Sequence, residues 1–224
     1  TKLTDDKFPA STLEQAGFAA LYAGQPTYNG VAVLARKASI GELELISVGN
    51  PRFEDVQKRL LCAKAGELTV ICAYFPNGQA LDSDKFKYKL AWIDALSQWI
   101  AGLRRDGHRV VLAGDFNIAP DDRDVHDPAL WAGQLHCSDA ERQRFKELVA
   151  GGLVDTFRMF DQPPKTYSWW DYRQLAFRRN AGLRIDHILV DESLARRVRA
   201  CTIDRAPRKN EQPSDHAPVV ADLE

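Results

Sequence analysis

Two short motifs carry the side chains with the clearest chemical potential. Asp215 and His216 stand together near the C-terminus, and Asp115 and Asn117 follow the apolar run of residues 108–113. A carboxylate, an amide and an imidazole at the ends of apolar segments are the groups that can hold a hard metal ion and cleave a phosphodiester. Either motif alone also fits a simple turn or a strand-to-loop corner. Together they predict a hydrolytic phosphodiester site.

The chemistry assigns a role to each group. Phosphodiester cleavage needs an activated water, an acceptor for its proton, and donors or positive charge around the phosphate oxygens. Because Asp115 and Asn117 are two apart on an extended segment, we expect both on the same side at a sheet mouth. Asp115 would bind or activate water, and the Asn117 amide would donate to phosphate. His216 would act as base or electrostatic stabiliser, oriented by a second carboxylate.

Asp186, in the apolar segment 183–190, is the candidate for that second carboxylate. Strand alternation would put Arg184 and Asp186 on one face and His187 on the other. An acidic residue in such a strand is expected at an edge or in a site. The alternative is a surface carboxylate paired with Arg184. We expect His187 and His108 to be structural or solvent-facing.

Aromatic and basic residues gather in the second half of the chain. Residues 173–209 hold ten basic and four acidic side chains and follow the aromatic segment 167–172. Interleaved aromatics and arginines suit a groove that stacks on or wedges into nucleic acid. The alternatives are core aromatics and a solvated charged surface. Tyr74, at the end of an apolar segment, could reach a phosphate with its hydroxyl or lie at the edge of the core.

Composition limits the class of protein. The chain has 224 residues, 45% hydrophobic and 27% charged, so it can bury the core of one globular domain over residues 1–224. A formal charge of -1 excludes a uniformly basic nucleic-acid coat, although charge can be segregated within a neutral total. No apolar stretch approaches membrane-spanning length, and residues 1–9 are too charged for a signal peptide. These features predict an intracellular protein without a membrane partner.

The four cysteines are Cys62, Cys72, Cys137 and Cys201. They are widely spaced, and none forms the close pair typical of a zinc knuckle or a redox site. Two of them lie in apolar runs. We therefore expect buried free thiols in a reducing compartment.

Hydrophobic patterning predicts an α/β fold. Strands are expected at residues 30–34, 43–48, 68–74, 108–113, 167–170, 183–190 and 218–223. Apolar residues recurring every three or four positions predict an amphipathic helix over 84–105. A capping-box pattern at Ser138 predicts a second helix that ends at Gly151, and a short helix is expected over 192–200. Because several strands precede the first long helix, mixed or antiparallel sheets covered by helices fit best.

Six motifs, taken in order, resemble those of bacterial exonuclease III over the whole of residues 1–224. They are Tyr74-Phe75-Pro76-Asn77-Gly78, Gly114-Asp115-Phe116-Asn117-Ile118, Gly152-Leu153-Val154-Asp155-Thr156-Phe157-Arg158, Ser168-Trp169-Trp170-Asp171-Tyr172-Arg173, Gly182-Leu183-Arg184-Ile185-Asp186 and Ser214-Asp215-His216-Ala217-Pro218. The resemblance implies a deoxyribonuclease I-like fold, a four-layer sandwich of two mixed β-sheets flanked by helices. The site is expected at one edge of the sandwich.

The same resemblance implies a DNA-repair phosphodiesterase. With Mg²⁺ or Mn²⁺ it would cleave double-stranded DNA on the 5′ side of abasic sites, and it would have 3′→5′ exonuclease and 3′-phosphatase activities. The implied partner is duplex DNA with abasic sites or 3′ ends. The implied protein is a monomer in the bacterial cytoplasm, associated with the nucleoid.

Carried over by position, the resemblance gives each site residue a role. His216 and Asp186 match a catalytic His-Asp dyad, and Asp115 matches the acid that activates water or serves the leaving group. Asn117 and Tyr74 match phosphate-stabilising positions. The expected metal-site residues are Asp215, Asp115 and Asn117. The expected pocket and DNA contacts are Trp169, Leu183, Ile185, Arg173 and Asn77.

The chain departs from the family pattern at its start. The family opens with a strand carrying Asn-x-Asn-Gly, a helix, and a strand ending in Gln-Glu-Thr-Lys, whose Asn and Glu are principal metal-site residues. Because the chain opens at Thr1-Lys2-Leu3, we expect these N-terminal strands to be missing and residues 1–224 alone to be impaired. The alternatives are a catalytically impaired DNA-binding fragment of this fold and a superfamily phosphatase acting on a small phosphoester.

Overall fold

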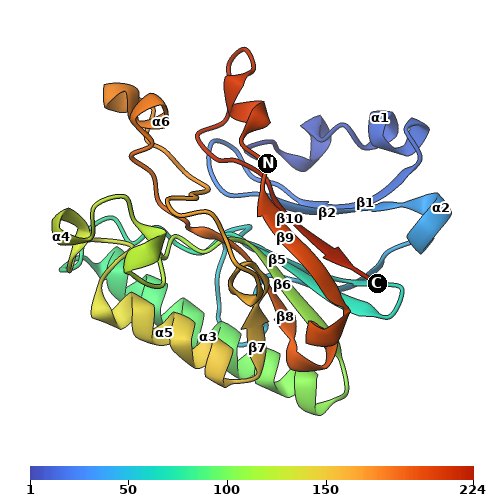
Figure 1. Ribbon diagram of the computed structural model, residues 1–224. Coiled ribbons are helices and arrows are strands. Elements are labelled where there is room, and N and C mark those ends of the chain that lie inside the picture. Colours follow the sequence, from blue (N-terminus) through green and yellow to red (C-terminus); the bar gives the residue numbers. More distant parts are fainter. The chain divides into compact units, whose positions relative to one another are not determined.

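A computed structural model describes all of residues 1–224 (Figure 1). The chain divides into two compact units. Unit 1 comprises Thr1–Phe75 and Trp92–Gly114, and unit 2 comprises Pro76–Ala91 and Asp115–Glu224. The long helix α3 (Asp84–Arg105) contributes residues to both. None of the helices combines the length and the apolar run that crossing a membrane requires.

Unit 1 is built on two packed layers of strands. Its strands are β1 (Phe18–Ala23), β2 (Val31–Arg36), β3 (Glu44–Val48), β4 (Leu60–Ala65), β5 (Leu68–Ala73) and most of β6 (Arg109–Asp115). β1 and β2 form an antiparallel pair, β3, β4 and β5 are antiparallel, and β5 and β6 are parallel. Val31, Val33, Leu61 and Ala63 share one buried cluster. The β1–β2 pair therefore covers one face of β4 and β5.

Unit 1 also has three short helical turns, η1 (Asp5–Lys7), α1 (Ala10–Gln15) and α2 (Lys37–Ile40). Unit 2 contains two antiparallel strand pairs. β7 (Leu153–Asp155) pairs with β8 (Asp186–Asp191), and β9 (Val198–Ile203) pairs with β10 (Val219–Leu223), as Figure 1 shows.

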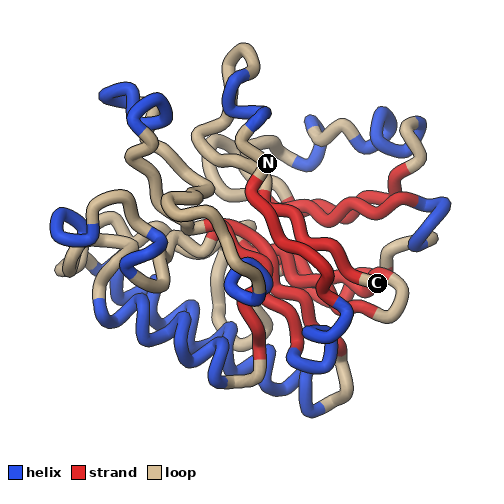
Figure 2. Tube along the Cα trace, in the orientation of Figure 1, coloured by secondary structure: helices blue, strands red, loops and turns tan.

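The helices of unit 2 are mostly short turns between strands. They are η2 (Asp122–Asp124), α4 (Pro128–Trp131), α5 (Asp139–Ala150), η3 (Thr156–Met159), η4 (Arg173–Leu175), α6 (Ala176–Arg179), η5 (Glu192–Arg197) and η6 (Ala206–Lys209). The Ser138–Glu141 capping box starts α5 as predicted. Figure 2 shows that loop and short helical turns make up the chain between β7 and β8. Most of the candidate site residues that are not in strands lie in loops or short helical turns.

The α/β class and the mixed sheet are confirmed. That sheet has six strands. Four of them, β3, β4, β5 and β6, were described above with unit 1, and the other two, β7 and β8, belong to unit 2. The helix over 84–105 is confirmed with its predicted bounds. All four cysteines are free, and three are buried.

Three local predictions were wrong. Residues 167–170 form only isolated bridges, and β8 begins at Asp186 because the backbone just before it bonds to loop segments instead. The predicted helix over 192–200 stops at Arg197, and β9 follows. The β-branched residues Val198, Thr202 and Ile203 pair with β10 instead of continuing the turn.

Candidate active site

The central segment of the candidate site is the chain around Trp169. Its backbone forms antiparallel bridges with Leu183 on one side and with His216 on the other. The Trp170 amide donates to the Asp215 carbonyl at 3.0 Å. The Trp169 segment therefore joins two segments that are far apart in the sequence.

His216 and Asp186 form the ion pair that the sequence predicted. Nδ1 of His216 lies 3.0 and 2.9 Å from the two carboxylate oxygens of Asp186. The fully buried Ser168 hydroxyl accepts the backbone N–H groups of Ile185 and Asp186, both at 3.0 Å. Ser168 thereby fixes the backbone at Asp186, a role that the sequence did not reveal because this serine stands inside an aromatic cluster.

The imidazole of His216 carries positive charge at neutral pH. Burial alone would lower its pKa, but the charge of Asp186, its hydrogen bond, and the charges of Asp115 and Asp215 raise the pKa to about 9. The side chain is 29% exposed, so a substrate can reach it. Its free Nε2 lies 3.9 Å from Oδ2 of Asp115. One imidazolium therefore stands between two carboxylates.

Asp115 and Asn117 meet through a tight turn and not through strand alternation. β6 ends at Asp115, and Asn117 has a left-handed φ of 52°. The Asn117 backbone N–H donates to Oδ1 of Asp115 at 2.8 Å, and its side-chain amide donates to Oδ2 at 3.2 Å. Gly114 precedes them because a Cβ there would lie 2.0 Å from the carbonyl oxygen of Ala73.

Asp115 is a mostly buried carboxyl beside another acid. Burial, and then the charge of Asp186, raise the pKa of its carboxyl, while His216, the Asn117 N–H and Lys89 oppose the rise. A carboxylate whose proton affinity is raised in this way is suited to exchanging protons during catalysis.

Lys89 is a buried cation that supports the same turn. Its ammonium donates to the carbonyls of Asn117 at 2.7 Å and Asn77 at 3.2 Å, and it forms an ion pair with Glu141. The Asn77 side-chain amide donates to Oδ1 of Asn117 at 3.2 Å. Sequence reasoning missed Lys89. Its place on the apolar face of the helix, three residues after Phe86, was the available signal.

Asp115, Asp186 and His216 could hold a metal ion, since one ligand atom from each lies within 4.8 Å of the others. The donor set fits a hard divalent cation through its carboxylates, because Mg²⁺ takes oxygen ligands and keeps several waters. The imidazole fits less well. Its Nδ1 is taken by Asp186, and Mg²⁺ prefers oxygen to nitrogen ligands. Asp215 lies outside this group, and its Oδ2 accepts the Trp169 indole N–H at 3.0 Å.

The residues expected to line a sugar pocket form a packed cluster. Leu183 is 0% exposed and Ile185 is 3% exposed, and they lie with Val125 in one buried apolar group. Trp169 and Trp131 are partly buried against it. Trp169 therefore connects the apolar group to Asp215, the residue next to His216, through its indole N–H.

For two predicted site residues the structure shows contacts with other side chains. Arg173 is 84% exposed and forms a salt bridge with Asp171 at 2.6 Å. Tyr74 belongs to unit 1, where the Arg59 guanidinium lies 5.2 Å from its ring centroid. The other predicted site residues belong to unit 2.

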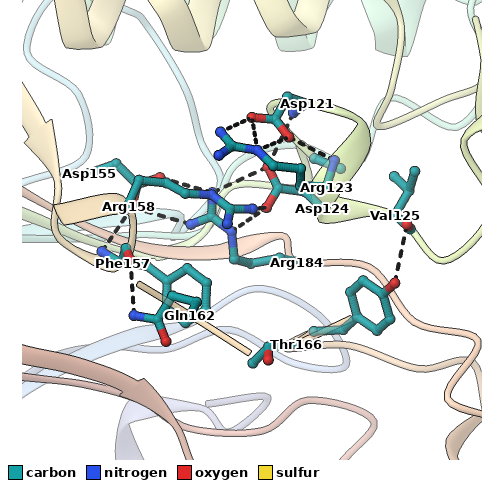
Figure 3. Close-up of polar contacts among 12 residues, drawn as sticks. Asp121, Arg123, Asp124, Val125, Asp155, Phe157, Arg158, Gln162, Thr166 and Arg184 are labelled. Carbon is teal, nitrogen blue, oxygen red and sulfur yellow. Dashed lines mark hydrogen bonds and ion pairs between the residues drawn. The ribbon is translucent and has the colours of Figure 1, made fainter. Parts of the chain in front are cut away.

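The alternative pairing of Asp186 with Arg184 is wrong. Arg184 is buried and binds Asp124 and Asp155, as Figure 3 shows, with contacts of 2.6 and 2.8 Å. Arg158 adds a further ion pair to Asp124. Arg184 thus anchors the chain just ahead of Asp186 to Asp124 and Asp155, and it leaves the Asp186 carboxylate free to bind His216.

Arg184→Met should lower the free energy of unfolding by about 3–5 kcal/mol, because it leaves two buried carboxylates without their shared cation. Urea unfolding followed by tryptophan fluorescence measures this. Arg123→Met is the matched control, since Arg123 pairs with Asp121 on the surface and is 70% exposed. It should cost about 1 kcal/mol or less. Equal losses in both variants would contradict a structural role for the buried network.

Residues 2–216 match the family model described as the endonuclease/exonuclease/phosphatase family. Exodeoxyribonuclease III of Haemophilus influenzae is 35% identical over 235 residues, covering 99% of this chain and 86% of the relative.

Two solved structures have closely similar folds. The 3′ phosphatase from Neisseria, bound to a product DNA hairpin, is 42% identical with a TM-score of 0.92. An AP endonuclease from Archaeoglobus fulgidus is 33% identical with a TM-score of 0.92. Each match covers 100% of this chain and 86% of the other chain.

Proposed function

The chain belongs to the exonuclease III and AP endonuclease family, and from that premise we propose that it is a DNA-repair phosphodiesterase. The proposed reactions are hydrolysis of duplex DNA 5′ to abasic sites, 3′→5′ exonuclease cleavage and removal of 3′ phosphates. The family match runs through both units, which supports one functional domain over residues 1–224. We also propose that the protein acts as a monomer in the cytoplasm of a bacterium, where its DNA substrate lies.

The observation that carries this proposal is the placement of His216 between Asp186 and Asp115. Asp186 holds Nδ1 of the ring, so Nε2 is the nitrogen left to meet the scissile phosphate. The imidazolium would stabilise the negative charge that builds on the phosphate oxygens. Asp115, with its raised pKa, would take or return the proton that the reaction moves.

Amide groups supply the proposed second set of phosphate contacts. The Asn117 side-chain amide sits beside Asp115 and is held by Asn77. Lys89 fixes the backbone of both asparagines. This support favours Asn117 as the donor to a phosphate oxygen, with Asn77 and Tyr74 as further contacts to the DNA backbone.

Mg²⁺ or Mn²⁺ is the proposed cofactor. When bound, such an ion would supply Lewis-acid charge at the phosphate. Among the residues of this site, Asp115 and Asp215 are the proposed ligands, with Asn117 as a third. Asp186 is also within reach of such an ion, and its carboxylate holds Nδ1 of His216.

Incision of an abasic-site duplex is the test of this function. We expect cleavage with Mg²⁺ and none with EDTA, assayed by denaturing gel electrophoresis of labelled duplex. Hydrolysis of a small phosphoester without action on DNA would favour the phosphatase alternative. Binding of the duplex in both conditions without cleavage would favour the impaired DNA-binding fragment. Either result would overturn the proposal.

Trp169→Ala should reduce discrimination between abasic and intact duplexes more than it reduces overall affinity. An apolar wall formed by Trp169, backed by the buried Leu183 and Ile185, would sort sugars by fit, while cations such as Arg173 would supply attraction that does not depend on the lesion. Competition binding with the two duplexes measures the ratio. Trp131→Ala is the control, because Trp131 packs on the same apolar group and its indole N–H has no partner. An unchanged ratio in Trp169→Ala would return this residue to a packing role.

A further inference from the structure

A buried arginine lies among the aromatic rings beside the site. Arg208, on η6, is 7% exposed. Its guanidinium carbon lies 4.8 Å from the ring centroid of Phe177, 5.6 Å from that of Tyr172 and 5.9 Å from that of Trp170. Burying a guanidinium costs free energy, which contacts with aromatic faces and hydrogen bonds to carbonyls offset.

The same guanidinium reaches the segment that carries His216. Nη1 of Arg208 donates to the carbonyl of Ser214. The Tyr172 hydroxyl donates to the carbonyl of Pro213 at 2.8 Å. Two side chains that contact each other thus hold two successive carbonyls just ahead of Asp215 and His216.

The held segment has little regular structure of its own. Residues 210–215 contain no strand, and His216 makes only an isolated bridge to Trp169 before β10 begins. The Ser214 hydroxyl also fixes the backbone at His216, because it accepts the His216 backbone N–H at 3.1 Å. Arg208 is therefore connected to His216 by one hydrogen bond to the Ser214 carbonyl and by the turn at Ser214.

We propose that Arg208 is a positioning residue for catalysis, which fixes the Ser214–His216 turn so that the imidazole meets both Asp186 and the phosphate. The proposal rests on the function proposed above. A guanidinium suits this role because its flat faces pack on rings while its edge donates in the plane, which an ammonium cannot do. Small misplacement of a catalytic group lowers turnover strongly, so the effect falls on kcat.

Arg205 provides the matched control. Its guanidinium carbon lies 5.2 Å from the centroids of both Trp170 and Phe177, so it packs on the same rings. The bond to the Ser214 carbonyl comes from Arg208. Comparison of the two arginines therefore separates the effect of the hydrogen bond to the Ser214 carbonyl from the effects of charge and ring packing.

The first experiment measures steady-state incision by Arg208→Met, Arg208→Lys and Arg205→Met. We expect Arg208→Met to lower kcat by about tenfold or more with KM within about twofold of wild type. Arg208→Lys should not restore kcat, and Arg205→Met should keep kcat within about twofold. A rise in KM with a weaker salt dependence would make Arg208 a phosphate contact and overturn the proposal. Equal kcat losses in Arg208→Met and Arg205→Met would show that Arg208 acts only through packing, and would also overturn the proposal.

The second experiment needs no turnover. The Nδ1 proton of His216, held by Asp186, should give a resolved downfield NMR signal in wild type and in Arg205→Met. In Arg208→Lys, which retains the charge and the stem, that signal should broaden or shift. An unchanged signal would overturn the positioning role. If wild type fails to cleave DNA while the signal responds as expected, the proposed function fails and the positioning role stands.

Discussion

Replacement of His216 by alanine should lower kcat for abasic-site incision by about 10³-fold while DNA binding survives. The substitution removes charge stabilisation that matters most in the transition state. It does not remove a contact that binds ground-state DNA. The arrangement behind this expectation is His216 held by Asp186 on one nitrogen, with its other nitrogen 3.9 Å from Asp115. Single-turnover cleavage and a filter-binding or anisotropy titration measure the two quantities separately.

His108→Ala is the control for this experiment. His108 also has a hydrogen-bonded ring, through Nδ1 and the Thr69 hydroxyl at 2.9 Å, but it precedes β6 at the end opposite Asp115. Its loss should leave turnover within about twofold. If His216→Ala weakened binding and turnover by the same factor, His216 would be a structural residue and its catalytic assignment would fall.

Asp115→Asn should lower turnover by a factor on the order of 10³ and raise the Mg²⁺ concentration needed for half-maximal activity. The substitution removes the charge and the proton-accepting group. It keeps an oxygen that can accept the Asn117 backbone N–H, so the turn should persist. A Mg²⁺ titration of incision, with circular dichroism to monitor the fold, measures both effects.

Asp222→Asn is the matched control, since Asp222 is an exposed carboxylate on β10 in the same unit. It should leave turnover and the Mg²⁺ requirement unchanged. Full activity of Asp115→Asn at ordinary Mg²⁺ would show that the site does not depend on this carboxylate, and the proposed proton and metal roles would both be lost.

The sequence by itself determined part of the regular structure and, through the family resemblance, the identity of the candidate site residues. The helix over 84–105 follows from local apolar periodicity, and the start of α5 follows from its capping box. The pairing of His216 with Asp186 was also predictable, because acids within apolar strands and histidines beside turns stand out from their neighbours. These signals are local, so one sequence suffices to read them.

Tertiary structure decided which partner each polar group takes. Arg184 is two residues from Asp186, yet it binds Asp124, sixty positions away in sequence, and Asp155. Alternation along a strand could not reveal this, because the backbone before β8 bonds to loop segments.

Long-range contacts also determined which residues support the site and where β9 forms. Lys89 gained its role from Glu141, fifty-two positions away, and Ser168 gained its role from backbone N–H groups at Ile185 and Asp186. β9 exists because β10 offers it a ladder of hydrogen bonds. A side chain's type and spacing reveal what chemistry it can do, but burial and hydrogen-bond satisfaction are properties of the folded chain, and they select which contacts form.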